Sequence, residues 1–413
     1  MRDCIYETEY QESLGLDSLS AKAVPTDSPR KIKIARIITR MNLGGAQRAV
    51  LHLSRGLDTR RFEQMVITGD GGLLLQELAA ISSIRHQVIP EMTRHIGPGG
   101  AWDDMRSVKK ICEILRLFRP HIVHTHTPKA GIVGRWAARL AGVPKIVHTY
   151  HGFGFSPQHP RWQKAVYLGL ERATARITSQ FVAVSDPNRV LGQSYGIFRR
   201  DACALIRSGV DFADFQALSI DKAKKKIELG FEPSDKIVGV VASFTPAKAL
   251  HLFLEAAAKI ALEIPGVCFV MVGDGSLRPQ LEAQAERLGI GPALRMLGWR
   301  HDVPELLRTF DVFLLTSLWE GLPRSLVEAF LSGVPAVASH VDGIGEVVQE
   351  GRNGFLVPPG NAEAMAAAVI RLLKDEPLRQ TMGEQARLSV DDFSVQKMLK
   401  DYSDLYENIS AGI

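Results

Sequence analysis

The stretch KIVGVVASFTPAKALHLFLEAAAKIALEIPGVCFVMVGDG, residues 236–275, contains one complete unit of the pattern that defines the fold. It begins with an apolar, β-branched run, continues with a segment whose apolar residues have helical spacing, and ends in a second β-branched run. Strand-like runs that alternate with helical segments are typical of parallel sheets with helices on both faces. The stretch therefore predicts a β-α-β unit of an α/β fold.

The same alternation fills most of the chain in two successive blocks. From residue 31 to about residue 204, runs such as IKIARIIT, HIVHTHT and KIVHTY alternate with amphipathic segments. After the lysine-rich DKAKKKIELGFEPSD the pattern begins again and includes VFLLTS and AVASHV. Two doubly wound, Rossmann-like parallel-sheet domains fit this pattern better than one long sheet. The last amphipathic segment, residues 394–409, is expected to pack back across the domain junction.

Length and composition agree with a globular protein of two domains. The chain has 413 residues, 46% of them hydrophobic and 23% charged, which at about 150–200 residues per domain favours two. No apolar run reaches the roughly 18 residues that a membrane span requires, and the first 30 residues lack the apolar block of a secretory signal. The four cysteines have no C-x-x-C spacing, which predicts reduced thiols in a cytoplasmic protein. The expected divisions are a polar tail (1–30), an N-terminal domain (31–210), a C-terminal domain (211–390) and a returning helix (391–413).

Positive charge is concentrated in one part of the chain. The formal net charge is +5, but residues 101–210 contain 17 Lys and Arg against 6 Asp and Glu. Such a surplus can serve an anionic partner, such as a nucleotide, phospholipid head groups or a phosphate-linked acceptor, and it is equally compatible with ordinary solvated helix faces. Basic and aromatic residues are not interleaved as in a nucleic-acid-binding module, so nucleic acid is not an expected partner.

Ligands of open α/β sheets bind beyond the carboxyl ends of the strands, so the loops there contain the candidate site residues. Gly44 and Gly45 follow the first strand where a helix opens, and their amides can approach a phosphate. His151 follows another strand and can either donate to a sugar hydroxyl or simply pack. His124 and His126 share one face of a strand, but no third ligand stands at motif spacing and no metal site is expected. The G-x-G-x-x-G fingerprint is absent, which argues against a nicotinamide dehydrogenase.

The loops of the second block offer a cation and a tight turn. Lys248 follows a strand that ends near Ser243, and a lysine beside a helix start suits a diphosphate, although a lone lysine is usually only solvated. Gly273, Asp274 and Gly275 form a turn at the same edge of the sheet. Asp274 is a candidate for ligand binding, but we expect it to cap the helix that follows.

The stretch SLWEGLPRSLVEAF, residues 317–330, contains two glutamates eight positions apart. Glu320 is expected in a loop and Glu328 inside a helix, with the amides near Gly321 and Leu322 forming an anion cradle between them. Carboxylates accept hydrogen bonds from vicinal diols, so a sugar and a ribose are suitable ligands. A glycosidase pair is disfavoured, because a helix would separate the two by about 12 Å against the roughly 5–9.5 Å of such enzymes. Taken alone, the stretch is explained as simply by two surface glutamates.

Several motifs together make the chain similar to a known family. In order, NLGGAQRAV, HTHTPKAGIVGRWAARLAGVPKIVHTYHGF, FTPAKAL, VGDGSLR, the E-x7-E stretch and GIGEVVQEGRNGFLVPPG resemble the family 4 glycosyltransferases, which are retaining enzymes of the GT-B fold. The resemblance runs from about residue 34 to the C-terminus, and the two glutamates are its most specific part. It implies that Glu328 binds the nucleotide ribose, Glu320 the donor sugar, Lys248 the diphosphate and His151 the sugar, while Gly44 and Gly45 line the acceptor and phosphate side.

The resemblance also implies a reaction. A sugar would move from a nucleotide diphosphate sugar, expected to be UDP-linked, to an acceptor with retention of configuration, without a cofactor or a catalytic metal. The motifs HTHTPKAG and HTYHGF most resemble those of members that build bacterial exopolysaccharide, capsule or lipopolysaccharide, so a lipid-linked glycan is the expected acceptor. The basic N-terminal domain would then contact anionic head groups on the cytoplasmic side of the membrane. A non-catalytic nucleotide-sugar-binding subunit and another GT-B enzyme, such as an epimerase or a phosphorylase, are the alternatives.

One position departs from the family pattern. The family commonly has an arginine shortly before its lysine, where this chain has Ser243. A permanently charged, bidentate phosphate ligand is therefore missing there. Arg207 and Arg324 are candidates to replace this arginine. If neither replaces it, weaker donor binding or loss of activity is expected. Ser208 stands where the family often has asparagine, which is a milder change.

Overall fold

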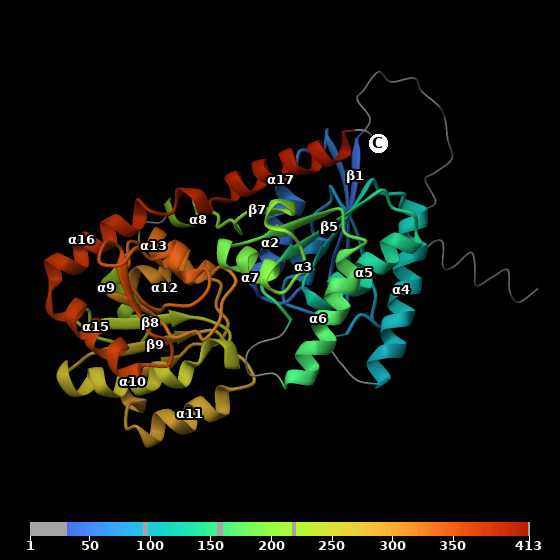
Figure 1. The fold of residues 1–413 in the computed structure, drawn as a ribbon. Coiled ribbons are helices and arrows are strands. Elements are labelled where there is room, and N and C mark those ends of the chain that lie inside the picture. Colours follow the sequence, from blue (N-terminus) through green and yellow to red (C-terminus); the bar gives the residue numbers. More distant parts are fainter. Residues whose placement is uncertain (1–30, 94–97, 155–159, 217–219, 412–413) are drawn as a thin grey trace, which may run out of the picture. The chain divides into compact units, whose positions relative to one another are not determined.

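Two parallel β-sheets form the framework of the protein in a computed structural model that describes residues 31–93, 98–154, 160–216 and 220–411 (Figure 1). The first sheet has seven strands in the order β3-β2-β1-β4-β5-β6-β7, and neighbouring strands are parallel. Its strands are β1 (Ile32–Ile38), β2 (Phe62–Thr68), β3 (Arg85–Val88), β4 (Ile122–His126), β5 (Lys145–Tyr150), β6 (Gln180–Ala183) and β7 (Cys203–Leu205).

Helices cover both faces of the seven-stranded sheet. Alternate residues of each strand point to opposite faces, and the apolar side chains on each face are buried against helices. In β1, Ala35 and Ile37 pack in a hydrophobic cluster with α4 and α5, whereas Ile34 packs in a cluster with α2 and α17. The helices are α2 (Gly45–Gly56), α3 (Leu75–Ala79), α4 (Pro98–Phe118), α5 (Pro128–Leu140), α6 (Arg161–Ala175), α7 (Asp186–Ser194), the 3-10 helix η1 (Arg200–Ala202) and, returning from the end of the chain, α17 (Val395–Ser410).

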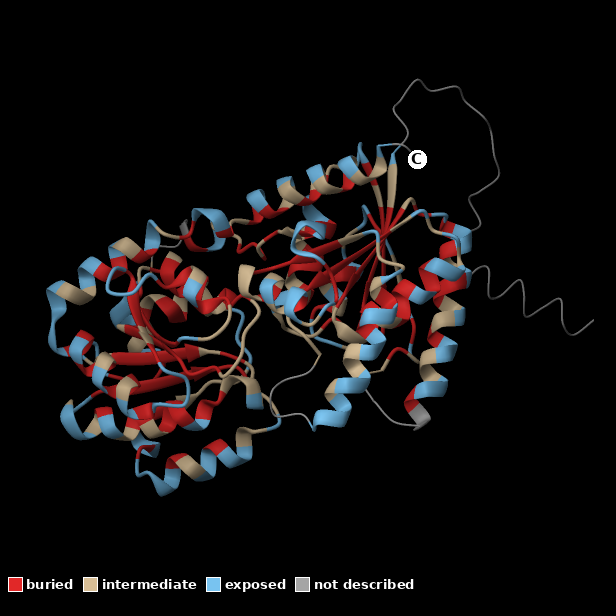
Figure 2. Cartoon of the chain, in the orientation of Figure 1, coloured by how far each residue is buried: buried red, intermediate tan, exposed pale blue. Residues whose placement is uncertain are grey.

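The second sheet has six parallel strands in the order β10-β9-β8-β11-β12-β13. Three of its central strands, β9, β11 and β12, are buried along their whole length, because helices cover both faces (Figure 2). The strands are β8 (Ile237–Val241), β9 (Cys268–Val272), β10 (Leu294–Met296), β11 (Val312–Leu315), β12 (Ala336–Ser339) and β13 (Gly354–Val357).

The helices of this second half are mostly short and follow its strands. They are α8 (Ala213–Gln216), α9 (Lys222–Glu228), η2 (Pro246–Lys248), α10 (Leu250–Glu263), α11 (Arg278–Arg287), η3 (Gly291–Ala293), α12 (Val303–Thr309), α13 (Arg324–Leu331), α14 (Ile344–Val347), α15 (Ala362–Lys374), α16 (Glu376–Arg387) and η4 (Asp391–Phe393).

The chain passes between the two sheets twice, and the two crossings pair with each other. Val210 N donates to Phe393 O at 2.8 Å, and Val395 N donates to Val210 O at 3.0 Å. A Cβ atom on Gly209 would lie 2.6 Å from Val395 Cα, so only glycine fits beside the returning chain. We retain the division at residues 210 and 390 as a proposal.

The expected two-sheet architecture is confirmed, including the C-terminal helix that packs on the first sheet. The sequence pattern did not predict β3, β7 and β13, which are short strands at the edges of the two sheets. Each of them is only three or four residues long, which is too short to show an alternating or β-branched run. The lysine-rich passage contains α9, whose Lys225 Nζ lies 2.7 Å from Asp302 Oδ2 and 2.6 Å from Glu305 Oε2. Among the described residues, none of the helices has the length and apolar character needed to cross a bilayer.

Candidate active site

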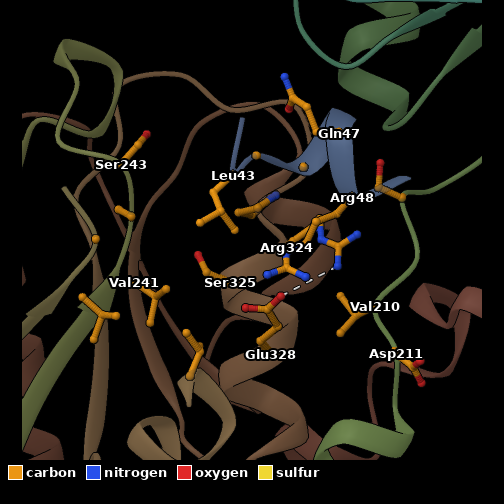
Figure 3. A pocket seen from close by; sticks show the side chains of 18 of the residues that line it. Leu43, Gln47, Arg48, Val210, Asp211, Val241, Ser243, Arg324, Ser325 and Glu328 are labelled. Carbon is orange, nitrogen blue, oxygen red and sulfur yellow. Dashed lines mark ion pairs between the residues drawn. The ribbon is translucent and has the colours of Figure 1, made fainter. Parts of the chain in front are cut away.

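One cavity of about 830 Å³ contains most of the predicted site residues in its wall (Figure 3). The wall is built from loops that follow strands of both sheets, which is where open α/β sheets bind ligands. The predicted residues that line it are Gly44, Gly45, His151, Ser243, Lys248, Gly273, Glu320, Leu322 and Glu328. Asp274 and Gly321 are not among the lining residues.

Glu320 and Lys248 form an ion pair in this wall. Glu320 lies in the loop between β11 and α13, and Lys248 is the last residue of η2. Ser317 Oγ also donates to Glu320 Oε1 at 2.7 Å, and the glutamate side chain is only 7% exposed. The residues implied for the donor sugar and for the diphosphate are therefore in direct contact with each other.

The loop around Glu320 is held by two close contacts. The Glu320 amide donates to Asp342 Oδ2 at 2.8 Å, so this amide is already occupied, and burial raises the pKa of the Asp342 carboxyl group. A Cβ atom on Gly321 would lie 2.0 Å from the carbonyl oxygen of His151, which joins the loop to the end of β5. Gly321 thus permits a close approach of the two halves instead of lining the cavity.

Glu328 lies within α13, which begins at Arg324 after the N-cap residue Pro323, so the expected position of Glu328 inside a helix is confirmed. Its carboxylate faces Arg324 one turn earlier, with Arg324 Nη2 3.9 Å from Glu328 Oε1 (Figure 3). Arg324 Nη1 donates to Gly209 O at 2.6 Å. Burial lowers the pKa of Arg324 to about 10, with a smaller contribution from Arg48, so the guanidinium is still charged at neutral pH.

The two arginines considered as replacements for the missing family arginine lie in different places. Arg324 lines the cavity, on the side of the wall opposite Ser243 in Figure 3. Arg207 does not line it and instead lies 2.8 Å from Glu346 Oε2 through its Nη2. The cavity therefore contains a buried guanidinium, but on α13 instead of on the loop that ends at Lys248.

Gly44 and Gly45 stand at the start of α2, as predicted. Gly44 is the N-cap residue with an extended backbone (φ −162°), so a left-handed conformation does not explain the glycine. A Cβ atom on Gly45 would lie 3.3 Å from Arg324 Cδ, so the small residue leaves room for the arginine of the other half. Sequence reasoning missed Gln47 and Arg48, two and three residues after Gly45 on this helix, which also line the cavity.

His151 ends a chain of histidines that runs along one face of the seven-stranded sheet, and the other two, His124 and His126, are fully buried. Its Nε2 atom lies 3.0 Å from His126 Nδ1, and the ring of His126 lies 4.0 Å from that of His124. His124 Nδ1 lies 2.6 Å from the hydroxyl of Tyr406 on α17. His126 Nε2 is buried with no hydrogen-bond partner among the described residues. This chain connects the returning helix α17 to the cavity.

His151, His126, His124 and His52 are neutral at physiological pH. Burial is the main cause, and it lowers the pKa of His151 to about 4, helped by the charge of Arg324. The pKa values of His124 and His126 lie well below the usual value for the same reason. His52, another cavity residue, has its pKa lowered to about 3, first by burial and then by Arg324. A group of three or more His, Cys, Asp or Glu able to hold a metal ion does not occur in the described part of the chain.

The turn after β9 differs from the expectation for Asp274. Gly273 has φ +125°, and a Cβ atom there would lie 1.9 Å from Ala242 O, so glycine is required. The N-cap of α11 is Leu277, without a side-chain cap, so the prediction that Asp274 caps this helix is wrong. Asp274 instead accepts from the Gly275 amide at 2.7 Å and from Arg278 Nη1 at 3.1 Å, because the turn places the helix start three residues further on.

The loop between β10 and α12 adds residues that sequence reasoning missed. Trp299, Arg300, His301 and Asp302 all line the cavity. Arg300 and Lys225 hold the Asp302 carboxylate and lower its pKa. The sequence did contain a signal for these residues, because their loop follows a predicted strand, as the other loops of the cavity do.

Comparison with known proteins supports the resemblance noted in the sequence. Residues 43–214 match the family described as Glycosyltransferase Family 4, and residues 221–389 match Glycosyl transferases group 1. The chain is 33% identical over 381 residues to the UDP-Gal:alpha-D-GlcNAc-diphosphoundecaprenol alpha-1,3-galactosyltransferase of Escherichia coli, which covers 91% of this chain and 97% of the relative. This chain is a family 4 glycosyltransferase.

A second relative and a solved structure are also similar to most of this chain. The N-acetyl-alpha-D-glucosaminyl L-malate synthase of Bacillus anthracis is 29% identical over 313 residues, which is 74% of this chain and 79% of the relative. The crystal structure of Anabaena HepE in complex with UDP and glucose is 25% identical, has a TM-score of 0.80 and covers 91% of this chain and 100% of HepE. The GT-B fold and the glycosyltransferase assignment are confirmed, and a transferase is favoured over an epimerase or a non-catalytic subunit.

Proposed function

We propose that this enzyme transfers a sugar from a UDP-linked donor to a lipid-linked glycan of the cell surface, with retention of configuration. The observation that carries the proposal is the single cavity that brings Glu320, Glu328 and Lys248 from one half of the protein against His151 and Gly45 from the other. The relative in E. coli, which is named for UDP-Gal and a diphosphoundecaprenol-linked sugar, supports both substrates.

The donor is held mainly by the six-stranded half. Glu328 accepts hydrogen bonds from the ribose diol, and Glu320 accepts them from the donor sugar. Lys248, which now pairs with Glu320, contacts the diphosphate when the donor binds. Lys248 and Ser317 both contact Oε1 of Glu320, so its Oε2 is available to accept from a sugar hydroxyl.

Negative charge grows on the departing diphosphate during transfer, so cations near it stabilise the transition state more than the ground state. Lys248 supplies one such charge. Arg324 supplies the second in place of the family arginine that Ser243 replaces, because its guanidinium is buried and positively charged in the same cavity. The first amides of α13 add the positive end of a helix.

The acceptor binds on the side of the seven-stranded half. Neutral His151 can donate one hydrogen bond to a sugar hydroxyl, and His126 holds its ring from behind. A leaving phosphate oxygen takes the proton of the acceptor hydroxyl on the same face, so no side-chain base is required. Exclusion of water from the closed cavity favours transfer over hydrolysis.

The enzyme would act at the cytoplasmic surface of the membrane that contains its acceptor. The basic surplus of residues 101–210 supports peripheral contact with anionic head groups. This contact brings the cavity to a lipid that cannot leave the bilayer.

Purified enzyme incubated with a panel of nucleotide sugars, with and without a membrane lipid extract, tests the proposal by UDP release. We expect release from one donor that requires the extract and is lost in Glu320→Gln. The control Glu363→Gln changes an exposed glutamate paired with Lys259 and should leave release unchanged. Tight donor binding without release under any condition would favour the non-catalytic alternative, and equal release without the extract would contradict a lipid-linked acceptor.

A further inference from the structure

Asp342 has a backbone conformation that residues with a side chain rarely adopt. Its φ is +39°, in the left-handed region that favours glycine. The residue lies in the turn between β12 and α14, and Gly343 follows it. Strained residues of this kind persist where the surrounding structure holds them, and they are common at functional sites. The contacts of the Asp342 side chain therefore show what the strain is retained for.

The Asp342 side chain contacts the loop that contains Glu320. Asp342 Oδ2 accepts a hydrogen bond from the Glu320 amide at 2.8 Å. In the part of the chain that the structure describes, this carboxyl group forms no ion pair and no other hydrogen bond. Asp342 is also not among the residues that line the cavity. Any effect of Asp342 on a bound substrate must therefore pass through Glu320.

The turn that contains Asp342 also packs against the backbone of the Glu320 loop. A Cβ atom on Gly343 would lie 2.3 Å from the carbonyl oxygen of Gly321, so glycine is required for this approach. Gly321 in turn lies against the carbonyl oxygen of His151. The Glu320 loop is therefore held by the turn after β12 as well as by the end of β5.

The contacts of the Glu320 side chain are of a different kind, because they change when the donor binds. Lys248 and Ser317 contact Glu320 Oε1 in the structure described here. Under the proposed function, Lys248 turns to the diphosphate and the carboxylate accepts from the donor sugar. The bond from the Glu320 amide to Asp342 involves no substrate-binding atom, so it can stay in place throughout. A fixed amide limits the directions in which the carboxylate of the same residue can point.

We propose that Asp342 is a positioning residue, which holds the Glu320 backbone so that the Glu320 carboxylate meets the donor sugar in the reactive geometry. The inference rests on the proposed function for the role of Glu320, whereas the contact between the two residues does not. A substrate-binding group that is misplaced by about 1 Å can lower a rate by about 10²-fold. The strained turn is retained because it fixes such a group.

Hydrogen exchange of the full-length enzyme tests the contact. In Asp342→Gly the carboxylate is lost, but glycine adopts a positive φ without strain, so the urea midpoint should stay close to that of the wild type. The Glu320 amide should exchange about tenfold faster, because its acceptor is gone. The matched control Arg119→Gly relieves a positive φ of 52° at an exposed residue after α4 and should leave this amide unchanged. Unchanged exchange in Asp342→Gly, or a large fall in its midpoint, would refute the proposal.

UDP release separates positioning from a general structural role. With the donor selected from the panel, Asp342→Gly should lower kcat about 10–100-fold, whereas the Kd for UDP, which lacks the sugar, should change less than about threefold. Asp342→Asn keeps an acceptor and tolerates a positive φ, so its kcat should lie within about threefold of the wild type. Equally weakened UDP binding, or no recovery with asparagine, would overturn the proposal. If the wild type releases no UDP from any donor, the proposed function fails, and exchange at the Glu320 amide still decides whether Asp342 holds this loop.

Discussion

The two sheets differ in what they bury. The interior of the six-stranded half is one continuous hydrophobic cluster, and its charged site residues stand on the loops and helix starts that follow the strands. The seven-stranded half has several smaller clusters separated by buried polar groups, among them Arg36, His124, His148 and the ion pair of Arg135 with Glu171. One half is therefore an apolar scaffold that carries a donor site, whereas the other contains a polar network within its core.

The difference shows how the two halves position their functional groups. A loop on an apolar scaffold is held by a few local contacts, such as that of Asp342 with the Glu320 amide. His151 is instead positioned by His126, whose ring packs against that of His124, and His124 in turn contacts Tyr406 of α17. Buried polar groups are costly unless they are paired, so this half should be more sensitive to loss of a partner and to acid.

The largest effect is expected from breaking the buried ion pair. Arg135 Nη2 lies 2.8 Å from Glu171 Oε2, both side chains are buried, and Tyr150 also donates to that carboxylate. Arg135→Met should lower the free energy of unfolding by about 3–5 kcal/mol, because Glu171 is left charged and buried. Urea denaturation followed by circular dichroism measures this.

The matched control is the exposed pair of Arg199 and Asp201. Arg199→Met should cost less than about 1 kcal/mol. Adding Glu171→Leu to Arg135→Met should recover part of the loss, since the uncompensated charge is gone. If Arg135→Met lowers the free energy of unfolding no more than Arg199→Met does, the buried polar network does not make this half more sensitive to loss of a partner.

The second effect concerns turnover in the apolar half. Lys248→Ala should reduce the rate of UDP release about 10²–10³-fold with little effect on folding, because a preorganised cation beside the leaving diphosphate is removed. Steady-state kinetics measure the change. Lys259→Ala, which removes a lysine from a surface pair with Glu363, is the control. A rate within threefold of wild type would show that Lys248 does not contact the diphosphate.

The third effect is the acid sensitivity of the seven-stranded half. The pKa of His151 is lowered from 6.5 to about 4, so above pH 6.5 the histidine is neutral in both the folded and the unfolded protein. Between pH 6.5 and 4 only the unfolded chain takes up the proton, so the free energy of unfolding falls as the pH falls, by up to about 3 kcal/mol for this residue.

Urea unfolding at pH 7, 6 and 5 tests the sign and the location of this effect. His151→Gln and His52→Gln, which also removes a histidine of strongly lowered pKa, should each flatten the pH dependence. Replacing His251 on α10 of the other half is the control. An unchanged slope in both variants would remove these histidines as its cause.

The smallest effect tests the replacement arginine. Arg324→Lys keeps the charge but loses the planar donor fork that stabilises the departing diphosphate, so kcat should fall about tenfold with a smaller change in the KM for the donor. Donor-dependence of UDP release measures both constants. Arg207→Lys is the matched control, because Arg207 pairs with Glu346 and does not line the cavity. If both variants behave alike, Arg324 has no special role at the diphosphate.

Much of this protein could be predicted from local sequence pattern. Alternating β-branched and amphipathic segments predicted two parallel sheets, and motif order predicted the family. Most of the proposed site residues follow strands, and the rule that ligands bind at the carboxyl ends of parallel strands explains why they lie in one cavity. The prediction that Asp274 caps a helix failed because the turn at Gly273 shifts the helix start, and no local signal showed that shift.

What local pattern could not provide are contacts between segments that are distant in the sequence. Three such contacts depend on how the two halves and the returning helix pack. They join Gly45 to Arg324, Gly321 to His151, and Tyr406 to His124. Strand and helix formation, by contrast, depend on spacing between near neighbours, which a sequence displays directly. Side-chain type and order were therefore sufficient for the fold and the family, whereas tertiary packing alone decided that Arg324, and not Arg207, lines the cavity and that His126 holds His151.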